Sequence, residues 1–223
     1  MEGKLLANHL QGTGVLKDPL LISAFKAISR ADFVRPEDKP YAYIDEPRQI
    51  GFGQTISQPT TVAFMLELLT PRPGQKILDV GAGSGYQSAL LGRVVAFNEF
   101  GEELPANQRG KVIGLEFRPE LATMARQNLA RYGLIAKQVV AVHCLNAAKG
   151  YPAEAPYDGI ISAAAAAEVP RAWQEQLAPG GKIVMPINST ILQIIKEGPD
   201  KFVTHRFEGY SFVPFVPDVE PDE

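Results

Sequence analysis

The chain has 223 residues, of which 45% are hydrophobic and 21% are charged, and its formal net charge at pH 7 is −3. This length suits one globular domain with a sizeable core, and the composition argues against disorder. The mildly acidic balance offers no basic footprint for nucleic acid. No apolar run approaches the roughly 18 residues of a membrane span, and the first residues lack the pattern of a signal peptide. We therefore expect a cytoplasmic protein that binds neither nucleic acid nor membrane.

The first part of the chain alternates helix-like segments with turns. Asp18 and Pro19 are typical of a helix start, and the residues after them place apolar side chains on one helical face. Residues 35–50 are charged and proline-rich, which predicts a surface loop. Pro59 fits the first turn of a helix over 59–69, where the missing N–H of a proline does no harm.

From Lys76 onward, short apolar runs alternate with helical periods. The predicted strands are 76–80, 111–117, 138–144, 157–164, 182–187 and 190–197, with another extended segment, 210–217, near the end. Helices are predicted over 86–96 and 118–133, and 169–181 is predicted as a helix followed by a turn. This alternation indicates a parallel sheet covered on both faces. The polar stretch 97–110 is interpreted as a solvent-exposed loop insertion.

The histidines and the single cysteine give no sign of a metal site. Cys144 alone excludes an internal disulfide and a cysteine-based metal cluster. His9, His143 and His205 are scattered along the chain, and we interpret them as surface or core residues. Trp173 is predicted to lie in the core. We therefore predict no metal ligand.

The stretch "ILDVGAGSGY" places three alternate glycines between a predicted strand and a predicted helix. Such a turn lets backbone N–H groups approach a ligand, although a tight turn without a ligand also explains it. The spacing is G-x-G-x-G, not the G-x-G-x-x-G that holds a dinucleotide pyrophosphate. The acid before the first glycine repels phosphate but suits an ammonium group. The predicted cofactor-binding residues are Asp79, Gly81, Gly83, Ser84 and Gly85.

Glu116 ends the second predicted strand, "KVIGLEF". In doubly wound sheets an acid at this position accepts hydrogen bonds from the ribose hydroxyls of a nucleoside. The alternative is a solvated acid in a loop. Together with the glycine turn, Glu116 indicates an adenosine ligand with an amino-acid end and no phosphate, which is S-adenosylmethionine.

Taken together, these segments resemble the protein-L-isoaspartate O-methyltransferase family from about Leu5 to Pro217. The resemblance is carried by "GVLKDPLLISAFKAISRADFV", "IGFGQTISQP", "ILDVGAGSGYQSALL", "GLEFRPELATMARQNL", "YDGIISAAAAAEVP" and "QLAPGGKIVMPI", of which "GQTISQP" is the most specific. It implies an α/β fold with a Rossmann-like, doubly wound, mostly parallel methyltransferase sheet and an N-terminal helical cap. Residues 1–75 would form the cap and the substrate side, 76–217 the S-adenosylmethionine-binding core of one compact domain, and 218–223 a frayed acidic tail.

The activity that the resemblance implies is methyl transfer from S-adenosylmethionine to the free α-carboxylate of L-isoaspartyl residues in damaged proteins, which initiates their repair and releases S-adenosylhomocysteine. The partners are then isoaspartyl proteins and peptides, and we expect a monomer. A carboxylate is already ionised near neutral pH, so the segment "GQTISQP" needs no titratable group to orient it. By the resemblance, Ser57 contacts this carboxylate, while Thr55 and Gln54 shape the loop over the donor methyl. Alternatively, Thr55 and Ser57 only cap the helix near Pro59.

Three stretches depart from the family or allow a second interpretation. Most members have a GDG-like turn after the third strand, and its acid binds the adenine amino group; here the turn is "LNAAKG", with Asn146 in the place of the acid. Its carbonyl can still accept that hydrogen bond without a charge. The small residues of "SAAAAAEVP", 162–170, line the cleft floor by the resemblance, although they are also good helix formers. The insertion 97–110 is unusual.

Two alternative functions fit the same residues. One is a related carboxyl methyltransferase that acts on a modified peptide or a small molecule. The other is a non-catalytic S-adenosylmethionine-binding module that recognises damaged protein. The intact glycine turn and Ser57 disfavour the second alternative, whereas the altered turn at Asn146 favours it.

Overall fold

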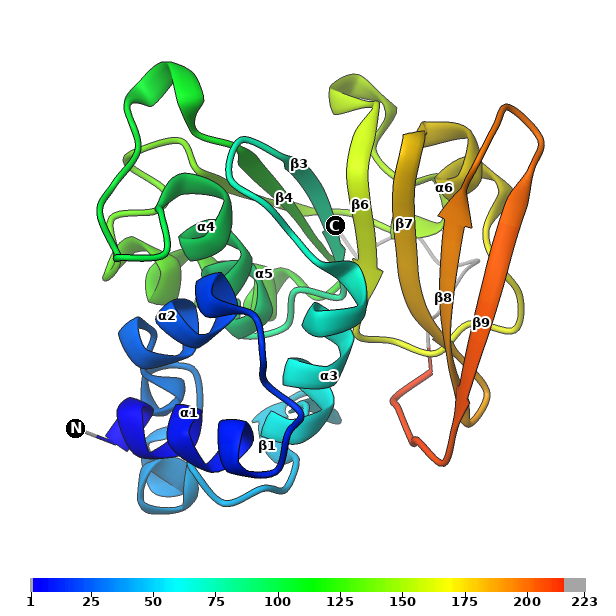
Figure 1. The fold of residues 1–223 in the computed structure, drawn as a ribbon. Helices are drawn as coiled ribbons and strands as arrows, with labels where there is room; N and C mark the ends of the chain where they lie inside the picture. The colour runs from blue at the N-terminus through cyan, green and yellow to red at the C-terminus, as the bar shows by residue number, and fades with distance from the viewer. Residues whose placement is uncertain (1, 215–223) are drawn as a thin grey trace.

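The computed structural model describes residues 2–214, which form a small N-terminal cap and a seven-stranded sheet with its helices (Figure 1). The cap contains helices α1 (Glu2–Gly12) and α2 (Pro19–Ala27), the 3-10 turns η1 (Arg30–Asp32) and η2 (Pro36–Tyr41), the hairpin β1 (Arg48–Gly51) and β2 (Gln54–Ile56), and helix α3 (Pro59–Leu69).

The remaining elements build the sheet and its crossovers. In chain order they are β3 (Lys76–Val80), α4 (Tyr86–Ala96), η3 (Ala106–Gln108), β4 (Lys111–Glu116), α5 (Pro119–Ala130), β5 (Val140–Cys144), η4 (Ala147–Lys149), η5 (Pro152–Glu154), β6 (Tyr157–Ser162), α6 (Arg171–Gln176), β7 (Leu177–Ile187), β8 (Thr190–Lys196) and β9 (Phe202–Glu208).

The predicted helix starts in the cap are confirmed. The carboxylate of Asp18 accepts hydrogen bonds from the backbone N–H groups of Leu20 and Leu21, and Pro19 occupies the first turn of α2. Pro59 likewise begins α3. Both helices therefore start where a proline costs no backbone hydrogen bond.

The strand order of the sheet is β5-β4-β3-β6-β7-β8-β9. Strands β3 to β7 are parallel, and β8 and β9 are added antiparallel at one edge. After β5 the chain returns past β3 to form β6, so the winding direction reverses beside β3. In doubly wound sheets, ligands bind outside the carboxyl ends of the strands at such a reversal. The Rossmann-like fold expected from the sequence is confirmed.

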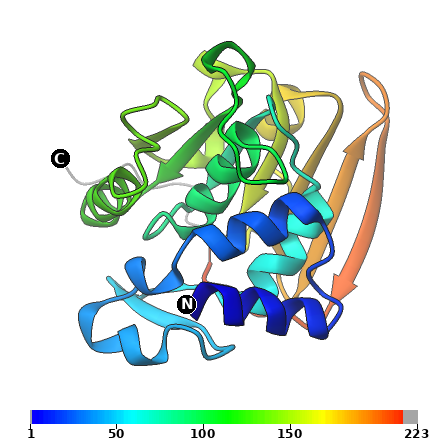
Figure 2. The same ribbon diagram turned by 60° about the vertical axis from the view of Figure 1, so that its left-hand side comes forward.

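The two faces of the sheet are covered unequally. Helices α4 and α5 cover β3, β4 and β5, and α3 lies across β6, β7 and β8 (Figures 1 and 2). The opposite face packs against the short helix α6 and the adjoining turns, with Trp173 fully buried among them. The prediction of Trp173 as a core residue is confirmed.

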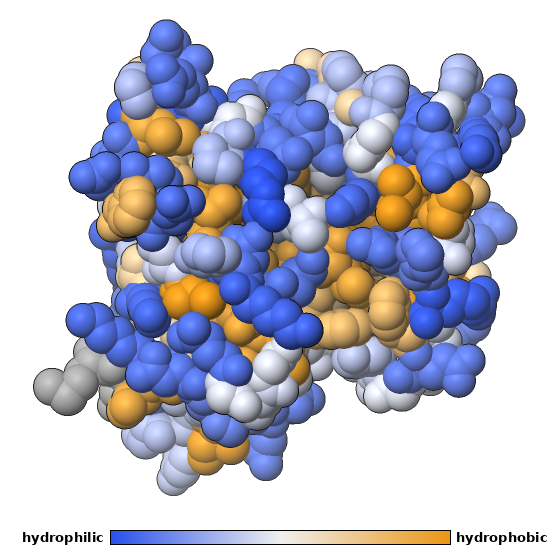
Figure 3. Space-filling view, viewed as in Figure 1, coloured by the Kyte–Doolittle hydropathy of each residue, from blue (hydrophilic) through white to orange (hydrophobic). Residues whose placement is uncertain are grey.

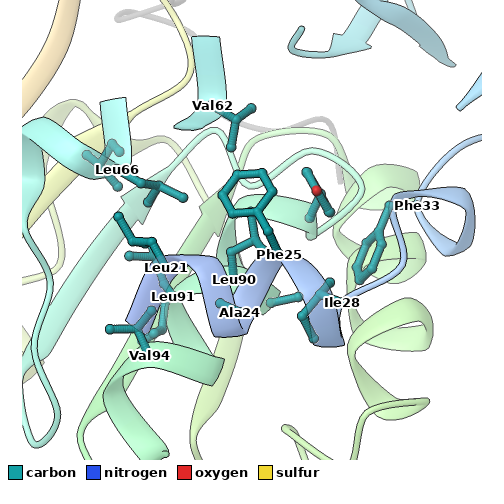
Figure 4. Close-up of a cluster of buried hydrophobic side chains, with 14 of the residues drawn as sticks. Leu21, Ala24, Phe25, Ile28, Phe33, Val62, Leu66, Leu90, Leu91 and Val94 are labelled. Atoms are coloured by element: carbon teal, nitrogen blue, oxygen red, sulfur yellow. The ribbon is translucent and has the colours of Figure 1, made fainter. Parts of the chain in front are cut away.

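The cap and the sheet share one hydrophobic cluster. Figure 4 shows α2 side chains directed between α3 and α4. The labelled residues are Leu21, Ala24 and Phe25 from α2, Ile28 just after α2, Phe33 just after η1, Val62 and Leu66 from α3, and Leu90, Leu91 and Val94 from α4. The apolar side chains of the cap and those of α4 belong to one hydrophobic core. The cap therefore precedes the sheet in the chain but does not have a core of its own.

The C-terminal part differs from the sequence prediction in two places. Residues 169–181 were predicted as a helix followed by a turn, but after α6 residues 177–181 form the beginning of β7, which carries a register shift against β6. Strand β9 was not predicted, whereas residues 210–214 of the predicted segment 210–217 contribute only an isolated bridge, between Pro214 and Ala165. The rest of that segment and the tail 218–223 lie outside the described residues.

The insertion 97–110 is held firmly against the fold and lies at the edge where the strands begin (Figure 1). Phe97 is buried, and the Arg93 guanidinium carbon lies 3.6 Å from its ring centroid. Arg93 Nη2 also donates to the Gly101 carbonyl at 2.8 Å, and Glu103 pairs with Lys137 at 2.6 Å. Most residues of 97–110 are exposed, as predicted, while the buried Phe97 and these side-chain contacts attach the loop to the fold.

Hydrophilic side chains cover most of the face seen in Figure 3, and apolar side chains show between them. None of the helices described between residues 2 and 214 is both long and apolar enough to cross a bilayer.

Candidate active site

A pocket opens where four neighbouring parallel strands end. Its lining includes Val80 at the end of β3 and Gly81 after it, Leu115 and Glu116 at the end of β4, Leu145 after β5 and Ala163 after β6. We call it the strand-end pocket. The space between its lining atoms, part of which is open solvent, is about 730 Å³. The pocket therefore lies beside β3, where the order in which the chain adds strands to the sheet reverses direction.

The glycine turn forms one wall of the strand-end pocket. Gly81 and Gly83 both line it, and Gly83 has a φ of 55°, which favours glycine. A Cβ atom on Gly83 would lie 3.2 Å from Cδ1 of Ile50, another residue that lines the pocket. A side chain at Gly83 would therefore occupy space between the turn and the hairpin of the cap.

Glu116 connects the turn to the neighbouring strand. Its Oε2 accepts the backbone N–H of Gly83 at 2.8 Å, and its Oε1 accepts that of Arg118 at 2.9 Å. Burial raises the pKa of the Glu116 carboxyl, because the backbone donors offset only part of the cost of desolvation. Only 7% of the residue is exposed, yet it lines the pocket. The alternative of a solvated loop acid was therefore wrong, because the carboxylate is buried and accepts backbone N–H groups at the wall of the pocket.

Asp79 lies behind the glycine turn and does not line the strand-end pocket. It is fully buried, and its carboxylate accepts hydrogen bonds from Gln87 Nε2 at 2.7 Å and from the Ser88 hydroxyl of α4. Burial raises its pKa to about 6, and the charge of nearby Glu116 acts in the same direction. The expected direct contact of Asp79 with a ligand ammonium group is absent from this arrangement, because the side chain faces α4.

Ser84 and Gly85 also lie off the main pocket. Ser84 is buried and borders a smaller recess under the turn, together with Ser57 and Tyr86. Gly85 has a φ of 90°, and a Cβ atom there would lie 3.3 Å from the backbone of Ala125 in α5. Gly85 therefore permits close packing of α5 against the turn.

Asn146 lines the pocket on the side of β5. Its side-chain oxygen accepts the backbone N–H of Ala148 at 2.9 Å and so caps η4. The side chain of Asn146 is thus held in place at the start of η4, beside the pocket. The placement agrees with the expected location of Asn146, while its contact with adenine stays a prediction.

The polar segment of the sequence folds into the hairpin β1–β2 and the approach to α3. Gln54 and Thr55 line the strand-end pocket, whereas Ser57 lines a second hollow beside it. We call the second hollow the polar groove; it is lined by Pro47, Thr55, Ser57, Gln58, Thr60, Thr61, Ala163 and residues 208–213. Thr55, Ala163 and Val213 line both hollows. The structure thus brings the three predicted catalytic residues to the boundary between two adjoining sites.

The alternative of a simple capping role for Thr55 and Ser57 was wrong. The N-cap position of α3 is Gln58, and its side chain makes no capping hydrogen bond. The cap comes from Asp45, whose Oδ1 accepts the backbone N–H of Thr60 at 2.8 Å. Sequence analysis missed Asp45, because it lies in the charged loop 35–50 rather than next to the helix it caps.

Of the small-residue stretch 162–170, Ser162 ends β6 and residues 163–170 form an irregular segment, not a helix. Ala163 N–H donates to the carbonyl of Val80, Ala165 N–H to that of Val213, and Ala166 N–H to that of Pro186. Ala163 and Ala164 line the strand-end pocket. The helix interpretation was therefore wrong, and the cleft floor agrees with the structure at Ala163 and Ala164, while a role for the other small residues there stays a prediction.

The histidines remain outside both hollows. The ring of His143 stacks on that of Tyr151 at a centroid distance of 4.5 Å. Among residues 2–214, no group of three or more histidine, cysteine, aspartate or glutamate side chains is arranged to hold a metal ion.

A reversed, mostly parallel sheet with a glycine turn and an acid at the end of the next strand defines the class of Rossmann-like methyltransferases. A family model described as protein-L-isoaspartate(D-aspartate) O-methyltransferase matches residues 1–220. The chain belongs to this family.

Relatives of known name agree with this assignment. A protein-L-isoaspartate O-methyltransferase from Staphylothermus marinus is 41% identical over 219 residues, which are 96% of this chain and 94% of the relative. One from Aeropyrum pernix is 43% identical over 215 residues, 95% of this chain and 78% of the relative. A Plasmodium falciparum protein-L-isoaspartate O-methyltransferase, solved in complex with S-adenosyl-L-homocysteine, is 25% identical with a TM-score of 0.82, covering 96% of this chain and 98% of that one.

Proposed function

We propose that this protein transfers the methyl group of S-adenosylmethionine to the free α-carboxylate of L-isoaspartyl residues in damaged proteins, which initiates their repair. The observation that carries the proposal is the shared boundary of the two hollows. Thr55, Ala163 and Val213 line both the strand-end pocket and the polar groove. A donor in the pocket and a carboxylate in the groove would therefore meet at this boundary.

The residues of the strand-end pocket fit S-adenosylmethionine, which supplies a methyl group on a positively charged sulfonium. Glu116 offers carboxylate lone pairs for ribose hydroxyls, and Asn146 offers an amide for the adenine edge. Gly81 and Gly83 leave room for the amino-acid end. Asp79 supports the turn through Gln87 and Ser88 and acts without touching the donor.

The polar groove suits a carboxylate nucleophile that is already ionised. A free carboxyl group has a pKa near 4, so no general base is required at neutral pH. Ser57 supplies a hydroxyl donor that orients the carboxylate, and Gln54 and Thr55 form the wall between the two hollows. Correct orientation contributes more here than proton transfer does, because a small misplacement of a reactant can cost about 100-fold in rate.

Labelled S-adenosylmethionine with matched peptides tests this function. The peptides differ only in an L-isoaspartyl or an L-aspartyl residue at one position. We expect a base-labile methyl ester on the isoaspartyl peptide alone. Equal labelling of both peptides would refute the substrate assignment, and donor binding without transfer to either would favour a non-catalytic binding module.

The expectations of a cytoplasmic monomer that binds neither nucleic acid nor membrane stay predictions. Light scattering on the purified full chain measures the oligomeric state, and we expect the mass of one chain, 24.2 kDa.

A further inference from the structure

Asp45 ties the loop 35–50 to the segment that carries Ser57. Its Oδ1 accepts the backbone N–H of Thr60 at 2.8 Å, and its Oδ2 accepts the Thr60 hydroxyl at 2.6 Å and Gln58 Nε2 at 3.0 Å. Burial opposes ionisation of Asp45, but these hydrogen bonds outweigh it and lower its pKa. One carboxylate thus holds three donors of the chain just after Ser57.

Arg30 fixes the loop on both sides of Asp45. It is fully buried, and its Nε donates to the carbonyl of Ala42 at 2.8 Å while its Nη2 donates to that of Glu46 at 3.3 Å. Its guanidinium carbon also lies 5.5 Å from the ring centroid of Tyr86, the first residue of α4 after the glycine turn. Arg30 therefore lies between the loop that carries Asp45 and the start of α4 after the glycine turn.

Ser57 is held from two directions. Before it, Ile56 is buried and belongs to the hairpin, where Arg48 pairs with it. After it, Gln58 and Thr60 are bonded to Asp45. Without Asp45 the hydroxyl of Ser57 would be fixed only from the hairpin side.

We propose that Asp45 is a positioning residue for methyl transfer: it orients Ser57 through Gln58 and Thr60, and Arg30 holds the loop that carries it. This inference rests on the proposed function of Ser57. It assigns a role to a residue that contacts neither the donor nor the nucleophile and that lies outside the recognisable "GQTISQP" segment.

Rates of single-turnover methylation in a double-mutant cycle of Asp45→Ala and Ser57→Ala test the proposal. We expect Asp45→Ala to slow methylation of a saturating isoaspartyl peptide at least about tenfold, with donor affinity changed less than about threefold. In a chain that already carries Ser57→Ala, Asp45→Ala should have little further effect, because residues that act as one unit are not additive. Asp45→Asn keeps one acceptor oxygen and should restore part of the rate. The proposal would be overturned if the rate loss of the double variant equalled the product of the two single-variant losses. It would also be overturned if Asp45→Ala methylated at the wild-type rate.

Hydrogen exchange separates this result from the proposed function. In Asp45→Ala we expect faster hydrogen exchange of the Thr60 amide and its neighbours, whether or not the peptide is a substrate. Unchanged exchange would also overturn the proposal. If the wild-type chain methylates no isoaspartyl peptide, the proposed function is refuted, while the exchange rate still shows whether Asp45 holds this segment. If Asp45→Ala does not fold, Thr60→Val takes its place, because it removes only the hydrogen bond from the Thr60 hydroxyl to Asp45.

Asp38→Ala is the matched control. It removes a carboxylate of the same loop that is bonded to Arg35, and it should leave the methylation rate and the hydrogen exchange of Thr60 unchanged.

Discussion

The backbone N–H of Gly83 donates to Oε2 of Glu116 at 2.8 Å and so joins the glycine turn after β3 to the end of β4. Two motifs that lie 33 residues apart in the chain therefore form one wall of the strand-end pocket. The same carboxylate faces the position expected for the ribose. If the donor binds as proposed, one side chain contributes both to donor binding and to the shape of the glycine turn.

Removing this carboxylate should weaken donor binding. In Glu116→Ala we expect affinity for S-adenosylhomocysteine to fall roughly tenfold to more than 100-fold, since hydrogen bonds to a charged acceptor are worth about 1.5–3 kcal/mol each. Gly83→Val should also weaken binding, because its side chain would enter the space beside Ile50. Titration calorimetry measures both variants. Glu120→Ala removes an exposed carboxylate from α5 and is the control, and wild-type affinity in both test variants would refute the cofactor site.

The turn at Asn146 provides a second test of donor binding. If its amide oxygen accepts a hydrogen bond from the adenine amino group, Asn146→Asp should preserve or tighten binding, because a charged acceptor forms the stronger bond. Both residues also cap η4 through the N–H of Ala148, so the turn itself should persist. Asn146→Leu should weaken binding. Equal affinities of the three proteins would show that this turn does not contact adenine.

The buried carboxyl of Asp79 should make stability depend on pH. Its pKa is raised from 3.8 to about 6 in the folded chain. Between these values the folded state retains a proton that the unfolded state has lost, so stability falls as pH rises through this window. The limit is about 3 kcal/mol for a shift of about two units. Denaturant unfolding of wild type and Asp79→Asn from pH 4 to 7 should show the variant gaining relative stability as pH rises. A constant difference across this range would contradict the raised pKa.

Local pattern was sufficient to predict the core of the sheet. The buried runs before the glycine turn and before Glu116 identify parallel strands, and their ends converge on one pocket because all their carboxyl ends share an edge. The side of the sheet to which the Asp79 side chain points was harder to predict. Alternation along β3 places its side chain on the same face as Ile77, against α4, although its position next to the glycines indicates a ligand contact.

Long-range partners explain what the sequence did not reveal. Strand β9 exposes Thr204, His205 and Arg206, so its sequence lacks an apolar run, and it is extended because β8 offers a free edge. Asp45 caps a helix that begins 14 positions later in the chain, whereas the sequence rules for helix caps consider only the residues next to the helix start. In both cases the partner is determined by the assembled fold.

Ser57→Ala addresses the residue on which the proposed chemistry depends. The change removes one hydroxyl donor from the polar groove and leaves the volume nearly unchanged. Because Gln58 holds the N-cap position of α3 and Asp45 supplies the cap, stability should fall by less than the roughly 1 kcal/mol of a lost cap. Donor affinity should change less than about threefold, whereas single-turnover methylation of an isoaspartyl peptide should slow at least about tenfold. Ser189→Ala, at an exposed turn outside both hollows, is the matched control. Melting temperature, donor binding and methylation measured on the same preparation decide the matter: a stable variant that methylates at the wild-type rate would remove Ser57 from the reaction.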